Sequence, residues 1–372
     1  MGRSFLHIIK PYVRKALHSL RPSRDIEINS VEDAFTVHNR WTIHPEASVD
    51  TPELAKIDLV PGLARHEKSS YTAPSVEAVE LRDVLFCPVN HVILSKDFEV
   101  AAESICTIPQ RAYLDEHALH VRRVKRLAGT YTTFRSRWYH HHYHTLIDHL
   151  PRLYTLDKLV REKSVFLNHT PKILVAEGLT ALERLFFDRF TSPANELAVL
   201  NTRALYEVER FILLLPLTRR DIAFLPAPYP RWFRKQMDLG AARDRTERVY
   251  ISRKGAGSRR VTNEPELIEA LRAYDFKDYQ LENFTPKQQM SLFNHAEFVV
   301  SPHGAGLANL LFSSDASVIE CFASHQMVPN YYFLSKAMGH TYYPLFGSEE
   351  WREDDFEVDL DALCGLLNEM NA

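Results

Sequence analysis

Histidines and one carboxylate crowd a short stretch that could carry acid–base or metal chemistry. His140, His144 and Asp148 recur at every fourth position, so in a helix they would share one face. Two imidazoles and a carboxylate suit zinc or iron, but successive helical turns drift in angle and rise, which makes convergence on one ion difficult. His144 and Asp148 alone lie one turn apart, and such a pair can take a proton from a hydroxyl. One group would accept the proton while the other fixes its tautomer or charge, and the spacing does not choose between them.

A second stretch is typical of anion binding. The apolar run 298–300 breaks at Ser301 and Pro302, passes two glycines, and resumes as an apolar segment over 307–312. This pattern predicts a strand, a tight turn and a helix. A helix that begins directly after such a turn presents unpaired backbone N–H groups and a positive dipole end, which favour a phosphate. The alternative is a tight connection in which the glycines serve sterics alone.

Two flanking segments strengthen the interpretation as a nucleotide pocket. Residues 248–252 predict a short strand leading into a loop with four cationic side chains, and guanidinium groups bind phosphate bidentately. Residues 317–321 predict another strand, with Glu320 near its carboxyl end, where open α/β sheets bind ligands. A carboxylate at that position can accept hydrogen bonds from sugar hydroxyls. The combination predicts a nucleotide site that suits a sugar donor.

These residues carry a resemblance to a known family. The segment Ser301-Pro302-His303-Gly304-Ala305-Gly306-Leu307-Ala308-Asn309, with Ile251-Ser252-Arg253 before it and Val318-Ile319-Glu320 after it, resembles the signature of glycosyltransferase family 61. The segment Tyr143-His144-Thr145-Leu146-Ile147-Asp148-His149-Leu150-Pro151-Arg152-Leu153 is similar to the family's Tyr-His-x-x-x-Asp-x-Leu-Pro-Arg-Leu segment. The family usually has asparagine where this chain has His141. At this position the chain departs from the family's pattern.

The resemblance implies an inverting glycosyltransferase that moves a sugar from a nucleotide-diphosphate donor to a glycan or lipid-linked glycan, in capsule or surface-polysaccharide biosynthesis. It implies that His144 or Asp148 is the base. Glu320 would contact the ribose or the sugar, and Arg253 the diphosphate. The implied donor-binding residues are Arg253, Arg259, Ser301, His303, Gly304, Ala305, Gly306, Asn309 and Glu320.

No metal or other cofactor is expected. Arginines and the helix end can neutralise the leaving diphosphate instead of a divalent ion. The tripeptide Asp359-Leu360-Asp361 is interpreted as structural, because it lies beside a predicted helix start where acids are common caps.

Composition limits the classes of protein to which the chain can belong. A chain of 372 residues predicts about two domains, and 45% hydrophobic with 25% charged residues is ordinary for a soluble protein. A net charge of −3 argues against a general nucleic-acid binder. Four cysteines without paired spacing suit a reducing cytoplasm, and no apolar run reaches the roughly 18 residues of a membrane span. We therefore expect a cytoplasmic protein, either free or peripheral on the inner face of the membrane.

The chain divides into three predicted parts. Residues 1–24 form a basic amphipathic helix that either lies on an anionic membrane surface or packs on the body of the protein. Residues 25–228 form an N-terminal acceptor-side α/β domain, in which 25–80 is mostly loop. Residues 229–372 form a C-terminal Rossmann-like domain that binds the nucleotide sugar, because strands alternate with helices throughout. The fold class implied by the resemblance is α/β, with two Rossmann-like domains facing a cleft, the GT-B-type architecture.

Two rival functions follow from the same residues. A non-catalytic nucleotide- or glycan-binding module would keep the pocket without a working base, and retention of both His144 and Asp148 favours the enzyme. A metal hydrolase would use the histidine cluster as ligands.

Overall fold

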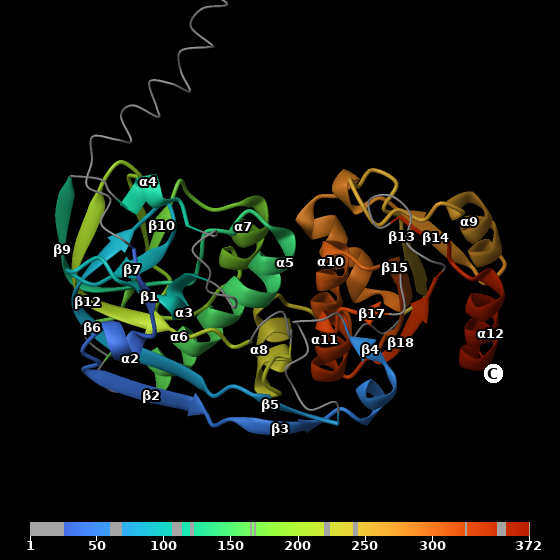
Figure 1. The fold of residues 1–372 in the computed structure, drawn as a ribbon, viewed down its shortest axis with the longest axis horizontal. Coiled ribbons are helices and arrows are strands. Elements are labelled where there is room, and N and C mark those ends of the chain that lie inside the picture. The colour runs from blue at the N-terminus through green and yellow to red at the C-terminus, as the bar shows by residue number, and fades with distance from the viewer. Residues whose placement is uncertain are drawn as a thin grey trace, which may run out of the picture.

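The computed structural model describes residues 26–59, 69–105, 114–119, 123–163, 166, 169–218, 224–240, 245–323, 326–347 and 355–371. This part of the chain is an α/β protein built around two main sheets, which Figure 1 shows side by side. The predicted α/β class is confirmed. The basic helix predicted for residues 1–24 lies outside the described residues.

The first sheet is mixed. Its strand order is β1-β8-β7-β6-β12-β9-β10-β11, with β2 also paired to β6. The strands are β1 (Ile28–Asn29), β2 (Asn39–His44), β6 (Val76–Cys87), β7 (Val92–Leu94), β8 (Val100–Ala101), β9 (Val124–Thr133), β10 (Lys172–Ala176), β11 (Leu197–Leu200) and β12 (Leu205–Leu214). Strands β9 to β12 are parallel, whereas β6 runs antiparallel to both β7 and β12. A short turn joins β6 to β7, and such a connection permits only antiparallel pairing.

Helices cover this sheet and fill its core. The long helix α6 (Leu150–Glu162) packs against β2, β6 and β12 and buries most of its residues. The other helical elements are α2 (Val31–Ala34), α3 (Ala102–Ile105), α4 (Glu116–Leu119), α5 (His142–His144), η3 (Thr145–His149), α7 (Ala181–Phe187) and α8 (Pro228–Gln236). In this part of the structure, no helix is long and apolar enough to cross a membrane.

The prediction that residues 25–80 are mostly loop is wrong. Besides β1, α2, β2 and the start of β6, this region forms β3 (Ala47–Asp50), η1 (Pro52–Lys56), β4 (Asp58–Leu59) and β5 (Ser70–Ala73). No residue of β2 or β3 is buried, and the apolar alternation of Trp41 with Ile43 and of Ala47 with Val49 is too short to mark a strand clearly. Figure 1 shows this blue segment running along the lower edge from the first sheet to the second. There β4 pairs with β17 (Gln326–Met327).

The second sheet is parallel throughout, as predicted for a doubly wound unit. Its order is β14-β13-β15-β16-β18, which in chain order reads 2-1-3-4-5. The strands are β13 (Glu247–Ile251), β14 (Phe276–Tyr279), β15 (Ala296–Pro302), β16 (Ser317–Phe322) and β18 (Thr341–Phe346). In such a sheet the chain reverses its winding between the first and third strands, here β13 and β15. Ligands bind beyond the carboxyl ends of strands at such a switch point.

Helices connect these parallel strands. They are α9 (Glu264–Arg272), η5 (Leu281–Asn283), α10 (Pro286–Asn294), η6 (Ala305–Phe312) and α11 (Asn330–Met338), and α12 (Leu360–Asn371) follows near the end of the chain. Thr285 and Gln288 form a reciprocal capping box that starts α10. The chain leaves the first sheet after β12 and enters the second at β13. Between them lies α8, which contacts α6, and the division predicted at residue 228 falls at the start of α8.

Candidate active site

The His144 and Asp148 side chains form a hydrogen-bonded pair. His144 Nδ1 lies 2.6 Å from Asp148 Oδ2, and the Thr218 hydroxyl donates to Asp148 Oδ1 at 3.1 Å. Asp148 is buried, whereas the His144 side chain is 24% exposed. Both carboxylate oxygens are therefore engaged inside the protein. The His144 ring nitrogen that does not face Asp148 is Nε2.

The pair sits where the helix widens. Residues of η3 form a π-helical turn between α5 and α6, and the Leu150 N–H donates to the Thr145 carbonyl, five residues back. Pro151 explains the change, because it has no N–H to donate to Ile147, four residues back. Turns of this kind occur often at functional sites. The sequence signal for it was the proline inside an otherwise helical apolar pattern.

The three-residue face considered as a metal site does not form. His141 is the N-cap of α5, so His140 precedes the helix and does not share a face with His144 and Asp148. Across the described residues, no three His, Cys, Asp or Glu side chains are grouped as ligands for one ion.

The second stretch folds as predicted into a strand, a turn and a helix. β15 ends at Pro302, and η6 begins at Ala305, although η6 is a 3-10 helix and not an α-helix. The first hydrogen bond at this end is donated by Leu307 N–H to the Gly304 carbonyl. The N–H groups of Ala305 and Gly306 precede that bond and lie at the start of the helix, where an anion is favoured.

The two glycines of this turn have different structural roles. A Cβ on Gly304 would lie 2.1 Å from Arg253 Nη1, so the absent side chain makes room for this guanidinium. A Cβ on Gly306 would lie 3.0 Å from Leu281 Cδ1 and 3.4 Å from Ile251 Cγ2, so Gly306 permits close helix packing. The steric interpretation thus fits Gly306. At Gly304 the two predicted anion-binding segments meet.

The cationic side chains of the loop after β13 differ in how fully they are paired within the protein. Arg260 is held by Asp355, with Nη2 and Oδ2 2.7 Å apart. Arg253 Nη2 donates to the Ser258 carbonyl at 3.1 Å, but its Nε is buried without a partner among the described residues. Burial, and then the nearby Arg259, lower the pKa of Arg253. A partly desolvated guanidinium beside another cation favours an anionic ligand.

A second histidine–carboxylate pair joins β15 to β16. His303 Nδ1 lies 2.5 Å from Glu320 Oε1, and the Tyr342 hydroxyl donates to Glu320 Oε2 at 2.5 Å. Glu320 is fully buried. Both of its oxygens are engaged, so the geometry makes Glu320 a support for His303 more readily than a ligand of the ribose or sugar. Tyr342 was missed at the sequence level, because only the pairing of β16 with β18 brings it here.

Two further predicted donor residues are buried. Ser301 is 2% exposed, and its hydroxyl donates to the Pro302 carbonyl. Asn309 is fully buried, and its amide Nδ2 donates to Gln289 Oε1 and to the Gly306 carbonyl, each at 3.0 Å. These contacts hold the turn in shape.

The two signature segments touch each other. His142 Nε2 lies 3.0 Å from Asn309 Oδ1, and α5 contacts η6. The Tyr331 ring, from α11, lies 5.9 Å from the Tyr143 ring and 5.5 Å from the His303 ring between centroids. Sequence reasoning did not assign roles to His142 or Tyr331. The only signal was that His142 precedes the first signature directly.

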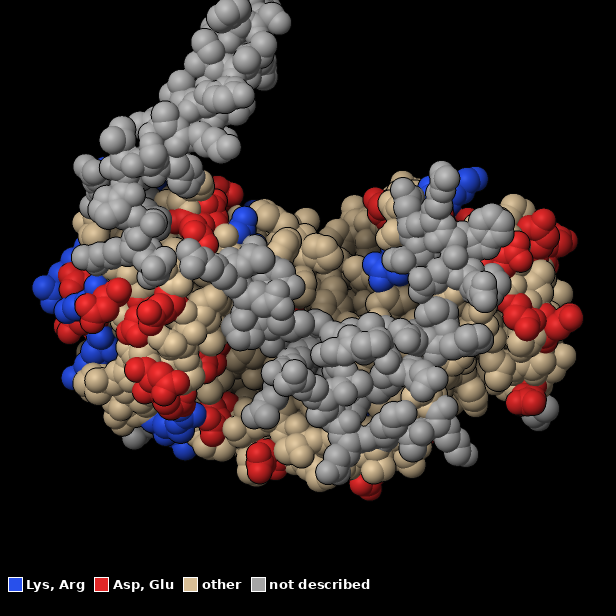
Figure 2. All heavy atoms as spheres, in the orientation of Figure 1, with Lys and Arg blue, Asp and Glu red and all other residues tan. Residues whose placement is uncertain are grey.

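A surface depression of about 520 Å³ lies elsewhere, along α8 and the C-terminal ends of η6 and α11. It contains none of the predicted site residues. Arg234, in its lining, is already bonded to the carbonyls of Phe312 and Ser313. We therefore place the candidate site at the signature segments. Figure 2 shows the surface hollowed between the two sheets, above the place where Figure 1 shows α5 facing α10.

These features define an α/β protein in which the helical segment that carries the His144–Asp148 pair in one sheet unit contacts η6 of the other unit. The family model described as Glycosyltransferase 61 matches residues 142–319, from the start of α5 to β16. This match supports membership of glycosyltransferase family 61, and the family suggests glycosyltransferase activity. No curated protein matches the chain.

Proposed function

We propose that this protein transfers a sugar from a nucleotide-diphosphate donor to a hydroxyl of a glycan acceptor, with inversion at the anomeric carbon. The observation that carries the proposal is the contact between the two signature segments. His142 and Asn309 bring the His144–Asp148 pair of the first unit to the anion-binding turn of the second. A base and a leaving-group site must be close for a single displacement to occur.

The donor binds at the switch point between β13 and β15. Its diphosphate is held by Arg253, Arg259 and the backbone N–H groups of Ala305 and Gly306. Support comes from the packing of Arg253 over Gly304 and from the unpartnered Nε of Arg253. His303, fixed by Glu320, lies at the same carboxyl end of β15 and completes the donor site.

The acceptor hydroxyl is activated by His144. Asp148 is buried with both oxygens engaged, so it orients the ring and stabilises the imidazolium, as the carboxylate does in a catalytic triad. His144 Nε2 accepts the hydroxyl proton while the oxygen bonds to the anomeric carbon. The bond from that carbon to the donor phosphate oxygen breaks, and the nucleoside diphosphate leaves from the opposite face.

The leaving charge is met by arginine and the η6 backbone without a divalent metal. In support, Asp359 of the Asp-x-Asp tripeptide accepts a hydrogen bond from Ala362 N–H at 3.0 Å and so caps α12. We also propose that the protein is a GT-B-type enzyme on the cytoplasmic side of the membrane, and that it acts in capsule or surface-polysaccharide synthesis on a free or lipid-linked glycan. The helix predicted for residues 1–24 would hold it to anionic lipid.

A donor screen tests the proposal. The purified chain is heated in the presence of UDP-, GDP- and CMP-sugars, since a bound ligand raises stability by mass action. We expect a UDP- or GDP-sugar to raise the melting temperature, with CMP-sugars as the monophosphate comparison. If no diphosphate donor stabilises the protein, the proposed donor site is wrong.

A further inference from the structure

Three aromatic rings form a small triangle at the surface beside the proposed base. Ring centroids of Trp138 and His144 are 6.3 Å apart, those of Trp138 and His141 6.4 Å, and those of His141 and His144 5.3 Å. Trp138 is 37% exposed, although tryptophan is a large apolar side chain. Its ring plane is tilted by only 31° from that of His144. The exposed Trp138 ring therefore lies directly beside the His144 ring of the His144–Asp148 pair.

The hydrogen bonds of a buried arginine hold the start of the turn that carries Trp138. Arg135, fully buried, donates to both carboxylate oxygens of Glu183 at 2.7 and 2.5 Å and to the carbonyls of Ala176 and Gly178. The Arg135 guanidinium lies 4.4 Å from the centre of the Tyr139 ring. The turn that follows Arg135 is therefore fixed to the body of the first unit.

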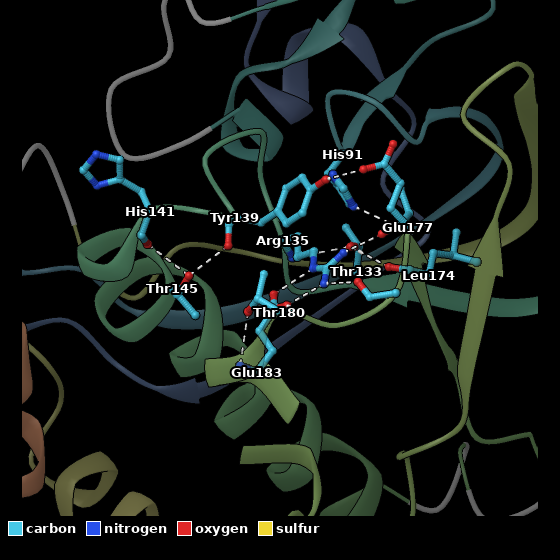
Figure 3. Close-up of polar contacts among 12 residues, drawn as sticks. His91, Thr133, Arg135, Tyr139, His141, Thr145, Leu174, Glu177, Thr180 and Glu183 are labelled. Atoms are coloured by element: carbon cyan, nitrogen blue, oxygen red, sulfur yellow. Dashed lines mark hydrogen bonds and ion pairs between the residues drawn. The ribbon is translucent and has the colours of Figure 1, made fainter. Parts of the chain in front are cut away.

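The far end of the turn is held in the same way. The Thr145 hydroxyl lies 3.0 Å from the carbonyl oxygens of both Tyr139 and His141. Figure 3 shows these contacts and shows the His141 ring pointing away from the buried network. A side chain held on such a turn can bind a ligand with little ordering cost.

A lone exposed apolar residue usually needs no explanation. Val124 and Val199 are more exposed than Trp138, at 50% and 63%, but they lie on β9 and β11 and not on this turn. Trp138 differs because its ring contacts the proposed base. Exposed aromatic surface with adjacent polar groups is the usual lining of a ligand site.

We propose that Trp138 is the platform on which a pyranose ring of the acceptor stacks, with His141 binding one of its hydroxyls and another hydroxyl directed at His144. This inference rests on the proposed function and names the acceptor side of that site. A pyranose presents a face of C–H groups that suits an indole face, while its hydroxyls lie at the rim. Burial lowers the pKa of His141, so its neutral imidazole can both donate and accept there.

The test separates acceptor binding from donor binding. Trp138→Ala, Trp138→Phe and the matched control Val199→Ala are compared with the wild type. Methyl pyranosides and disaccharides serve as sugar probes in saturation-transfer NMR, and UDP and GDP serve as donor probes in calorimetry. A pair of aromatic rings is worth about 0.5–1.5 kcal/mol, and with the same range for a pyranose on indole, Trp138→Ala should weaken sugar binding about two- to tenfold. Trp138→Phe should retain part of the binding, and Val199→Ala all of it.

Three outcomes would overturn the inference. Sugar binding to Trp138→Ala at wild-type strength would remove the platform, and so would failure of every pyranoside to bind the wild type. A loss of UDP or GDP affinity in Trp138→Ala would make the residue a nucleobase platform instead. Failure of the proposed function would give a different result, because no diphosphate donor would then bind the wild type, in which Trp138 is intact.

Discussion

His142 in α5 and Asn309 in η6 share a hydrogen bond of 3.0 Å although they lie 167 positions apart. The Asn309 amide nitrogen already donates to Gln289 and Gly306, so its Oδ1 accepts and His142 Nε2–H donates. Burial lowers the pKa of His142, which favours this neutral form. One bond thus sets the His142 tautomer and joins the two signature segments.

A double-mutant cycle on this pair tests the coupling. Each of His142→Ala and Asn309→Ala should destabilise the protein by about 1–3 kcal/mol, because each leaves a buried polar partner unsatisfied. The double variant should lose less than the sum, with a coupling of about 0.5–1.5 kcal/mol in urea unfolding. Strictly additive losses would show that the bond does not join the segments energetically.

Removal of the proposed base should affect chemistry and spare donor binding. His144→Ala and Asp148→Asn should each lower the transfer rate about a hundred- to ten-thousand-fold, since they disable one proton-accepting unit. Their combination should cost little more than either change alone. Nucleotide affinity by calorimetry should persist, because the donor contacts lie on the second sheet unit.

The neighbouring exposed residue provides the control for that experiment. His140→Ala removes an imidazole that precedes α5 and should keep transfer near the wild-type rate. Wild-type rates in both His144→Ala and Asp148→Asn would place the base elsewhere and remove this helix from the active site.

How far the sequence predicts this site depends on the range of each interaction. The strand, turn and helix over residues 298–312 follow from local apolar pattern and glycine position, and the capping box at Thr285 is equally local. The His144–Asp148 contact is one helical turn and was predictable for the same reason. By contrast, the His142–Asn309 bond and the contact between the Tyr143 and Tyr331 rings depend on how the two sheet units pack, which no local pattern reports.

The first unit was harder to predict for a different reason. Its strands β2 and β3 contain no buried residue, and β4 is only two residues long, so burial leaves little mark on the sequence. Leu54, near β4, is nevertheless fully buried in a cluster with Phe322 and Phe333 of the second unit. The sequence alone does not identify such a residue as buried, because the side chains that cover it lie far away along the chain.

Replacement of Arg253 should weaken donor binding. Arg253→Ala removes a charged hydrogen-bond donor and should cost about 1.5–3 kcal/mol in affinity for UDP or GDP. Gly304→Ala should reduce affinity too, because its Cβ would collide with Arg253 Nη1. The matched control is Arg260→Ala, whose side chain is occupied by Asp355. Equal affinities in calorimetry for Arg253→Ala and the wild type would remove Arg253 from the donor site.

Chelation should leave transfer intact. Arg253, Arg259 and the η6 backbone supply the positive charge in the proposed mechanism, so dialysis against EDTA should not change the rate with the donor found by screening. Loss of transfer with EDTA, and its recovery with added manganese or zinc, would show that the metal-free mechanism is wrong. Asp359→Asn in parallel would then report whether this carboxylate is a ligand.

A buried histidine of the second unit should make stability depend on pH. His340 Nδ1 accepts from the Ala316 N–H, its Nε2 donates to the Leu310 carbonyl, and both distances are 3.1 Å. Burial lowers the pKa of His340 to about 4. Between the ordinary histidine pKa of about 6.5 and this lowered pKa, His340 is protonated in the unfolded chain but neutral in the folded chain. This group's contribution is therefore complete above pH 6.5 and is lost as pH falls toward 4.

Urea unfolding of the wild type and His340→Gln at pH 7, 6 and 5 measures this effect. The stability advantage of the wild type should shrink below pH 6.5 with a limiting slope of about 1.4 kcal/mol per pH unit. Burial also lowers the pKa values of His91 and His149, so the difference between the two proteins, and not the absolute slope, isolates His340. His38→Gln, at an exposed histidine, controls for removal of an imidazole as such. A difference between wild type and His340→Gln that stays constant from pH 7 to 5 would mean that His340 is protonated equally in both states.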